Sequence, residues 1–291
     1  MTTPSTFRWL MTAPGAPLER SEFELPTPAP DEVIVRVVGC GLCHTDLGFL
    51  FGGVRTNHEL PVALGHEIAG TVETVGRDST QWAGKDVVIP AVLPCGACEL
   101  CSAGKETSCR NQKMPGNDFH GGFASHIVVP AQWLVDAGDL PEGIELADVA
   151  VLADAVTTPY QAMVRADVQP GDGVVLIGAG GIGSFGVQIA KAFGARVVAI
   201  DIDDEKITAA ALTGKFFGDP VKLSAKPDSK RKRTELHLVG NMHSRNLLTL
   251  TPDYLQQPVS GISSWDLSVS LAHRPSAQVA LLEISANSNL M

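Results

Sequence analysis

The chain has 291 residues, of which 44% are hydrophobic and 19% charged, and its formal net charge is −10. This composition is typical of a globular protein with room for two domains of ordinary size, and the acidic balance argues against nucleic acid or an anionic membrane as the main partner. No run approaches the roughly 18 apolar residues that a membrane-spanning helix needs. Residues 1–20 lack a basic segment leading into an apolar run, so we expect no secretory signal and a cytoplasmic protein with reduced thiols.

The first pattern along the chain is a β-branched run at Val33–Val38, which predicts a strand that ends at Cys40. We interpret Cys40 as a buried apolar thiol and Cys43, which opens the following turn, as a metal ligand. A redox dithiol is the alternative for this Cys-x-x-Cys pair. The donor expected to join Cys43 is His66, in the glycine-flanked run Gly65–Gly76. A lone histidine is usually an ordinary polar residue, but the glycines and the upstream thiolate favour a ligand.

Four further cysteines follow an apolar run at Asp86–Leu93, in a loop that contains proline and glycine. Spacing as tight as theirs brings four thiolates around one tetrahedral Zn²⁺ and leaves no room for water, which predicts a closed structural zinc site. The alternative is a disulfide pair, which a cytosolic setting disfavours. The predicted ligands are Cys95, Cys98, Cys101 and Cys109.

A catalytic zinc needs three protein ligands and one open position. After Cys43 and His66, the best candidate for the third ligand is Asp154, which lies among small apolar residues just before a predicted helix. The alternative for Asp154 is a helix N-cap. Two ionised ligands and a neutral histidine would cancel the charge of Zn²⁺, and the ion would acidify a bound alcohol as it acidifies bound water.

Residues 172–203 predict a strand, a glycine-rich turn, a helix and a second strand that ends at Asp201. A glycine-rich turn is weak as a signal by itself, but between a strand and a helix it is typical of dinucleotide binding, since the pyrophosphate then rests on the helix N-terminus. Asp201 would accept hydrogen bonds from the ribose hydroxyls and repel a 2′-phosphate, which favours NAD over NADP. The candidate cofactor-binding residues are Gly178, Gly180, Gly181, Ile182, Gly183, Asp201 and, before the first strand, Thr158.

The run Gly65–Ser79 matches the signature of the zinc alcohol dehydrogenases throughout, and the cysteine loop and the nucleotide turn follow in that family's order. Over about residues 7–213 the chain resembles the medium-chain members of this family. The resemblance implies an α/β protein in which a GroES-like, β-rich catalytic domain precedes a Rossmann-type nucleotide-binding domain, with the active site between them. We expect the catalytic domain at 1–155, with its zinc lobe at about 90–112, and the first part of the nucleotide-binding domain at 156–213.

The resemblance also implies roles around the metal. Thr45 is expected to take the alcohol proton, His44 to face the cofactor pyrophosphate, and Asp46 to orient the zinc-bound histidine. Glu67 is expected to be a neighbouring acid that can exchange onto the metal. The relay histidine of horse-liver-like members is absent from Leu47–Phe49, so we expect the proton to leave by another route, such as the ribose hydroxyls and His44.

Five segments resemble, more narrowly, the 6-hydroxycyclohex-1-ene-1-carbonyl-CoA dehydrogenases, which oxidise a ring hydroxyl to the ketone with NAD in anaerobic benzoyl-CoA degradation. On this resemblance we expect a zinc- and NAD-dependent oxidoreductase that acts on a cyclic hydroxyacyl-CoA and, if the fold is complete, forms a homo-oligomer. The residues themselves indicate only a secondary or similar alcohol. Two alternatives remain open: a general medium-chain alcohol or polyol dehydrogenase, and a zinc-binding remnant without turnover. The segments are Cys40–Phe49, Val54–Pro61, Gln112–Asp118, Gly121–His126 and Ala153–Pro159.

Residues 214–291 depart from this pattern. They hold 9 Lys+Arg and 6 Asp+Glu, which leaves 13 and 26 for residues 1–213, and only 4 of the 29 glycines. Buried parallel strands need near-continuous apolar runs, and this segment supplies one at most before its final residues. We therefore expect an atypical tail, such as a reading-frame shift would produce, that does not complete the sheet and leaves NAD turnover weak or absent. The basic run Lys230–Arg233 is interpreted as a solvated loop, with a nuclear signal or nucleic-acid patch as the alternative.

Overall fold

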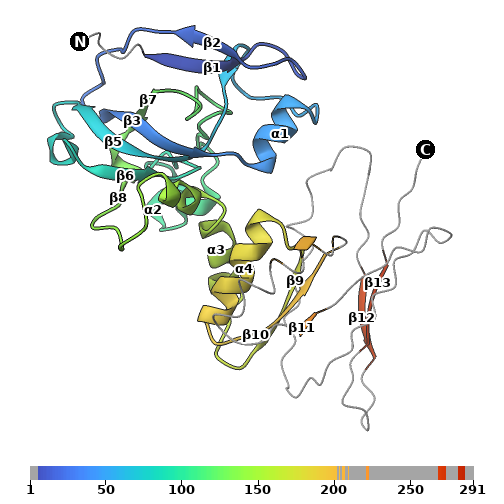
Figure 1. Ribbon diagram of the computed structural model, residues 1–291. Coiled ribbons are helices and arrows are strands. Elements are labelled where there is room, and N and C mark those ends of the chain that lie inside the picture. Colours follow the sequence, from blue (N-terminus) through green and yellow to red (C-terminus); the bar gives the residue numbers. More distant parts are fainter. Residues whose placement is uncertain are drawn as a thin grey trace. The chain divides into compact units, whose positions relative to one another are not determined.

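The computed structural model describes residues 6–201, 203, 205, 206, 209, 221, 222, 268–272 and 281–285 of the chain. It divides into two compact units, Met1–Ala155 and Val156–Met291, and each contains a hydrophobic core of its own (Figure 1). Within the described part, no helix is both long enough and apolar enough to cross a membrane.

An antiparallel five-stranded sheet forms the main core of the first unit. The predicted strand at Val33–Val38 lies within its second strand, which continues one residue past Cys40 because Gly41 still pairs with Glu67. Alternate side chains along the strands point to one face and are fully buried, as Val33 and Val35 are. The strands are, in spatial order, β7 (His126–Pro130), β3 (Glu32–Gly41), β5 (Glu67–Val75), β6 (Asp86–Ile89) and β8 (Val135–Asp136).

The antiparallel pairing of β3 with β5 brings the end of one strand beside the start of the other. Cys43 follows β3 and His66 precedes β5, so the chain direction alone carries these two residues to the same end of the sheet. A Cβ at Gly41 would overlap the carboxylate of Glu67 in the position that this side chain occupies. The glycine thus leaves room for a buried acid beside the two predicted ligands.

A smaller sheet and a short helix complete this end of the first unit. The sheet has the order β2-β1-β4, and its side chains pack with α1 (His44–Leu50) in a second apolar cluster built on Met11, Phe49, Val62 and Leu64. Its strands are β1 (Phe7–Met11), β2 (Glu19–Glu22) and β4 (Val62–Ala63). The remaining helical turns are α2 (Glu99–Ser102) and the 3₁₀ helices Thr80–Trp82, Glu106–Ser108, Ala131–Trp133 and Asp148–Ala153.

The 3₁₀ helix Asp148–Ala153 determines where Asp154 lies. Its small buried residues Ala150 and Ala153 pack against Ala69 and Val88 of the large sheet. The Ala153 carbonyl also accepts the N–H of Ala91, which follows β6. A residue from late in the first unit is therefore held against the sheet that carries the earlier ligands.

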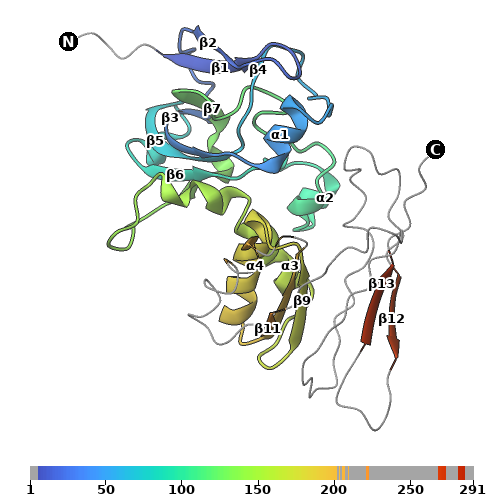
Figure 2. The same ribbon diagram turned by 45° about the vertical axis from the view of Figure 1, so that its right-hand side comes forward.

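The second unit begins with a strand–helix–strand arrangement. Its parallel strands are β9 (Gly173–Ile177) and β10 (Arg196–Ile200), and α4 (Gly181–Ala192) lies between them in the chain. Figure 1 labels both strands, and Figure 2 shows α4 and β9 from another side. Buried side chains of α4 and of α3 (Thr157–Arg165) form one apolar cluster with these strands. Together with the β-rich first unit, this arrangement confirms the predicted α/β class.

Few residues after Thr213 are described. The two-residue strand β11 (Val221–Lys222) pairs in parallel with β10, so the sheet has the order β11-β10-β9. β12 (Ser268–Ala272) and β13 (Leu281–Ser285) form a separate antiparallel pair. The expected incomplete sheet over 214–291 and the loop at Lys230–Arg233 otherwise lie outside the described residues and stay predictions.

Candidate metal centres and nucleotide site

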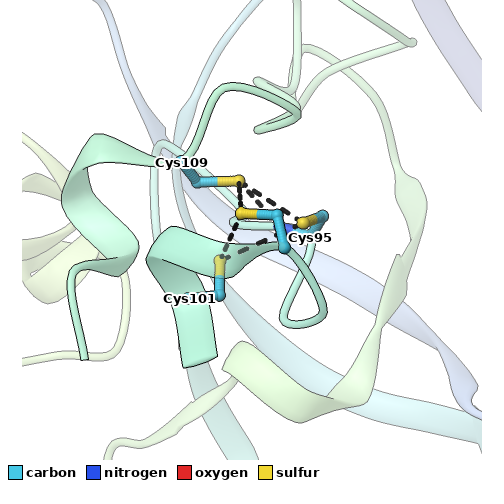
Figure 3. Close-up of side chains that lie close together, drawn as sticks. Cys95, Cys101 and Cys109 are labelled. Carbon is cyan, nitrogen blue, oxygen red and sulfur yellow. Dashed lines mark hydrogen bonds between the residues drawn. The ribbon is translucent and has the colours of Figure 1, made fainter. Parts of the chain in front are cut away.

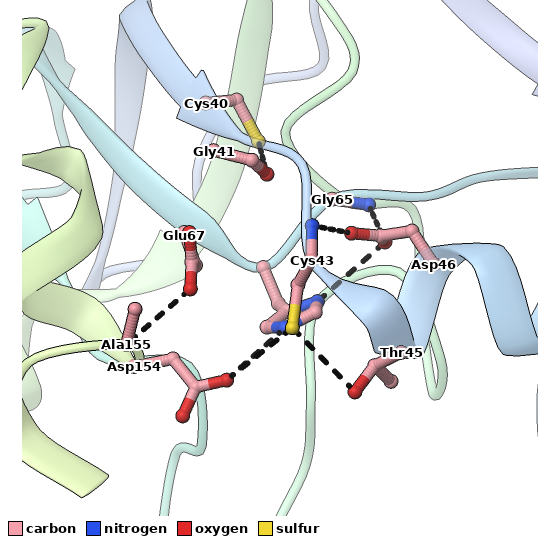
Figure 4. A network of polar contacts seen from close by, with 10 residues as sticks. Cys40, Gly41, Cys43, Thr45, Asp46, Gly65, Glu67, Asp154 and Ala155 are labelled. Atoms are coloured by element: carbon pink, nitrogen blue, oxygen red, sulfur yellow. Dashed lines mark hydrogen bonds and ion pairs between the residues drawn. The ribbon is translucent and has the colours of Figure 1, made fainter. Parts of the chain in front are cut away.

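Three separate segments of the first unit bring Cys43, His66 and Asp154 together (Figure 4). Asp154 Oδ2 lies 3.4 Å from His66 Nε2 and 3.9 Å from Cys43 Sγ. Ligands of a tetrahedral zinc ion, bonded at roughly 2.0–2.3 Å, stand about 3.3–3.8 Å apart. The donor spacing therefore fits a single metal ion bound by a thiolate, an imidazole and a carboxylate.

The surroundings of His66 point to the same chemistry. Its side chain is 1% exposed, and neither ring nitrogen has a hydrogen-bond partner among the residues that the structure describes. Burial alone lowers the pKa of His66, but the nearby Asp154, Asp46 and Cys43 outweigh it and raise the pKa to about 11. The groups around the ring therefore stabilise a positive charge at this place, and a bound Zn²⁺ would supply such a charge.

Asp46 links the two segments that carry the first two ligands. Its carboxylate is buried in the first turn of α1, where Oδ2 accepts the N–H of Cys43 at 3.0 Å and Oδ1 accepts the N–H of Gly65 at 2.9 Å. The same Oδ1 lies 3.6 Å from His66 Nδ1, on the far side of the ring from Asp154. The structure thus places Asp46 where a carboxylate that orients the histidine is expected.

Glu67 belongs to the same cluster of possible metal donors as Cys43, His66 and Asp154. Its side chain is 3% exposed, and Oε1 accepts the N–H of Ala155 at 3.2 Å. Its donor atom and those of the three ligands all lie within 4.8 Å of one another. Burial, followed by the charge of Asp154, raises the pKa of Glu67 above its usual range. The carboxyl group is therefore near enough to compete with Asp154 for a metal ion.

The hydroxyl of Thr45 and the ring of His44 lie on the exposed side of the same helix turn. Thr45 Oγ1 is 3.8 Å from Cys43 Sγ, so the hydroxyl borders the metal ligands. One turn later, Gly48 has no side chain, and a Cβ built there would meet only Val54, at 3.7 Å. The helix therefore presents a hydroxyl but no second histidine beyond it.

The four cysteines of the second set converge on one point (Figure 3). Four of their Sγ–Sγ distances are 3.5, 3.5, 3.8 and 4.0 Å. Thiolates around a tetrahedral Zn²⁺ stand about 3.8 Å apart, whereas a disulfide bond measures roughly 2.05 Å. Backbone N–H groups of Ala97 and Cys98 lower the pKa of Cys95, whereas burial raises the pKa of Cys101, so it is the spacing of the four sulfurs that indicates zinc. This geometry fits a closed zinc site and not a disulfide pair.

Cys40 lies apart from both sets. Its thiol is partly buried, close to where side chains at Gly65 and Gly122 would stand. Burial raises its pKa to about 12, which favours the neutral thiol over the thiolate at neutral pH. This agrees with an apolar thiol and speaks against a redox dithiol with Cys43.

The glycine-rich turn Gly178–Gly183 joins β9 to α4 in the second unit. Gly178 has a φ of +95°, and a Cβ at Gly183 would overlap its carbonyl oxygen, so these two glycines are needed for the turn itself. Side chains at Gly180 and Gly181 would meet nothing within 4 Å. Open space therefore lies at the N-terminus of α4, where a pyrophosphate is expected to bind.

Asp201 follows β10 and is held by the turn. Its Oδ2 accepts the N–H of Ala179 at 2.7 Å, and its Oδ1 accepts the N–H of Asp203 at 3.0 Å. Ile182 is 43% exposed on the first turn of α4, and Thr158 is exposed near the start of α3. The cofactor roles of these residues stay predictions.

The sequence reasoning missed two supporting features. One is Gly41, which makes room for Glu67. The sign of this in the sequence is that a glycine stands two positions before the predicted ligand Cys43. The other is the segment His120–Phe123, which bonds to Ala63–Gly65, immediately before His66. The glycine pair Gly121-Gly122 was a visible sign of close backbone approach, but its partner is distant in the chain.

Comparison with known proteins places these features in a family. Residues 29–141 match the model of the alcohol dehydrogenase GroES-like domain. The chain is 36% identical over 248 residues to an alcohol dehydrogenase from Moraxella sp. (strain TAE123), a match that covers 84% of this chain and 71% of that protein.

The chain is also similar to solved structures of dehydrogenases and reductases. A cobalt- and zinc-bound thermostable alcohol dehydrogenase from Pyrobaculum aerophilum has 31% sequence identity and a TM-score of 0.65, over 74% of this chain and 64% of that one. Acetophenone reductase from Geotrichum candidum, in complex with NAD, has 31% identity and a TM-score of 0.67, over 81% and 68%. The chain spans less than two thirds of some relatives, and 58% of an alcohol dehydrogenase from Geobacillus stearothermophilus.

We expect two zinc ions per chain, and one in the Cys101→Ser variant, because a closed site that loses one of four thiolates binds zinc far more weakly. Metal content after gel filtration in chelator-free buffer measures this. The Cys40→Ala variant is the matched control and should keep both ions, since Cys40 belongs to neither set. Loss of both ions from the Cys101 variant, or of none, would contradict two independent sites.

Proposed function

Because the chain belongs to the medium-chain zinc alcohol dehydrogenase family, we propose that it oxidises a secondary alcohol to the ketone, or reduces that ketone, with zinc and NAD. The observation that carries the proposal is the meeting of Cys43, His66 and Asp154, with the Thr45 hydroxyl beside them. In the forward direction the alcohol carbon gives a hydride to NAD⁺, and the hydroxyl gives up a proton.

In this proposal Cys43, His66 and Asp154 bind the metal, and Asp46 orients two of these ligands. A zinc ion bound between them would supply the Lewis acidity that lowers the pKa of an alcohol. Cys43 and Asp154 contribute two negative charges and His66 contributes none as a neutral ligand, so their charge balances that of the ion. Asp46 holds the backbones of Cys43 and Gly65, and thereby fixes the direction in which the thiolate and the imidazole point.

Thr45 is the group that we propose takes the alcohol proton, because its hydroxyl is exposed and borders the ligand set. A hydroxyl that accepts a proton must pass its own onward. No histidine occupies Leu47–Phe49, so we propose that the proton leaves through the exposed His44 and the cofactor's ribose hydroxyls.

NAD is the proposed cofactor because of the turn at Gly178–Gly183 and the carboxylate of Asp201. The bonds from Ala179 and Asp203 hold that carboxylate in place at the end of β10, beside the turn where the dinucleotide is expected. A fixed negative charge there repels the 2′-phosphate of NADP. The likeness to a reductase solved with NAD supports the same choice.

A cyclic hydroxyacyl-CoA is the narrower substrate that we propose, on the five segments of resemblance. Two of these segments lie against each other: Asn57 donates to Asp118 Oδ1 at 2.9 Å, and His58 N–H donates to the carbonyl of Asn117 at 2.7 Å. A general alcohol or polyol dehydrogenase fits the same residues equally well. NADH formation with 6-hydroxycyclohex-1-ene-1-carbonyl-CoA, against a panel of simple secondary alcohols and polyols, separates the two, and no turnover at all would favour a zinc-binding remnant.

Cytoplasmic location and assembly as a homo-oligomer belong to the same proposal. Six free cysteines, four of them arranged as thiolate ligands, need a reducing compartment. The mass of the zinc-loaded protein in solution, measured by light scattering, tests the assembly.

Replacement of the third ligand tests the metal chemistry. We expect Asp154→Asn to lower kcat/KM by at least about 100-fold, because a neutral amide is a poor zinc ligand and leaves the site with excess positive charge. Glu67→Gln should lower kcat/KM less. Asp139 is exposed and belongs to neither metal cluster, so Asp139→Asn is the control that should leave kcat/KM unchanged. If Glu67→Gln abolishes metal binding while Asp154→Asn keeps it, Glu67 is the third ligand.

Replacement of Asp201 tests the cofactor preference. We expect Asp201→Ala to weaken NADH binding and to narrow the difference between NADH and NADPH affinity, because the repulsion of the 2′-phosphate is lost. Fluorescence titration with both cofactors measures the two dissociation constants. Loss of the bond to Ala179 alone would weaken both cofactors by the same factor. An unchanged ratio would therefore rule out the proposed contact with the ribose.

A further inference from the structure

His120 lies outside the metal site but bonds to the chain just before a metal ligand. Its Nδ1 accepts the backbone N–H of Ala63 at 3.2 Å, and Ala63 is three residues ahead of His66. Burial, followed by the charges of Arg8 and His58, lowers the pKa of His120 to about 4. The ring is therefore neutral at ordinary pH, and Nδ1 keeps the lone pair that accepts this bond.

The bond between Ala63 and His120 is the first of a series that joins residues 120–123 to Ala63–Gly65. The N–H groups of Gly121, Gly122 and Phe123 donate to the carbonyls of Ala63, Gly65 and Leu64 at 2.7, 2.9 and 2.9 Å. Both backbone groups of Ala63 are thus bonded to residues 120–121. On its other side, Gly65 donates its N–H to Asp46 Oδ1.

Close packing fixes the segment further. Gly65 has a φ of +93°, and a Cβ there would lie 2.7 Å from both Cys40 Sγ and a ring carbon of Phe123. A Cβ at Gly121 would overlap the Gly65 carbonyl oxygen. The two stretches of backbone are therefore in direct contact, and a shift of one must move the other.

We propose that His120 is a positioning residue for the metal centre, which acts by fixing Ala63–Gly65 and thereby the direction of the His66 ring. The N–H groups that donate from Gly121, Gly122 and Phe123 belong to the backbone, so these bonds do not depend on the side chain of His120. The bond from His120 comes from a side chain, so it can be removed without altering the others. The proposal rests on the metal site of the proposed function but not on turnover.

Two variants of the full, zinc-loaded chain distinguish the effect of the hydrogen bond that His120 accepts from the effect of its side-chain size. His120→Asn keeps an acceptor oxygen at the place of Nδ1, whereas His120→Leu keeps the size and removes the acceptor. The measurements are zinc affinity at each site, by competition with a chromophoric chelator, and the visible absorption of protein carrying Co²⁺ at the Cys43 site. Thermal unfolding reports stability.

We expect His120→Leu to weaken metal binding at the Cys43 site by about 10- to 100-fold, as loss of an outer partner of a zinc ligand does, and to shift the Co²⁺ absorption. The four-cysteine site should be unchanged, and His120→Asn should stay within about threefold of the unmodified protein. Should the leucine variant fail to fold, His120→Met takes its place in the same comparison.

Equal metal binding in both variants and the unmodified protein would overturn the proposal. So would a loss shared equally by the two metal sites, which would mean a structural role alone. Failure of the proposed function gives a different result: metal binds at the Cys43 site with the expected dependence on His120, but no alcohol is oxidised.

Discussion

The backbone N–H groups of Cys43, which follows β3, and of Gly65, which precedes β5, both donate to one buried carboxylate, that of Asp46. Burial of such a charge costs several kcal/mol unless hydrogen bonds and positive charge compensate it. The bonds from Cys43 and Gly65 supply the first, and a positively charged His66 ring or a metal beside it supplies the second. The arrangement of β3, α1 and the start of β5 is therefore coupled to the metal site, because each side satisfies the same carboxylate.

Features that depend on neighbours in the chain could be predicted from the sequence. The runs Gly173–Ile177 and Arg196–Ile200 are apolar and bounded by turns, so the strands begin and end where the pattern says. The four-cysteine site follows from spacing alone. The bond between His120 and Ala63 could not be predicted, because it pairs residues 57 positions apart and no local pattern encodes the partner. The room that Gly41 leaves for Glu67 depends in the same way on the register of two strands.

Asp201 shows that a structural and a chemical role need not compete. One oxygen accepts the N–H of Ala179 in the glycine-rich turn and the other accepts the N–H of Asp203, which fixes the carboxylate at the end of β10. A group that is already rigid loses little entropy when it binds a ligand. In the proposed function, these two bonds therefore hold the carboxylate in the orientation in which it would bind the ribose. The two roles are separable in principle, since only the second distinguishes one nicotinamide cofactor from the other.

The two metal sites differ in the length of chain that they close. Cys95 and Cys109 are 14 positions apart, whereas Cys43 and Asp154 are 111 apart. The entropy of closing the longer loop costs about 2 kcal/mol more. The longer closure also requires the large sheet and the 3₁₀ helix at Asp148–Ala153 to be in place. As the chain leaves the ribosome, the cysteine loop can capture zinc from its own short sequence, while the other three ligands meet only after the whole first unit has folded. We therefore expect scarce zinc to fill the four-cysteine site first and to leave the Cys43 set of the first unit without metal.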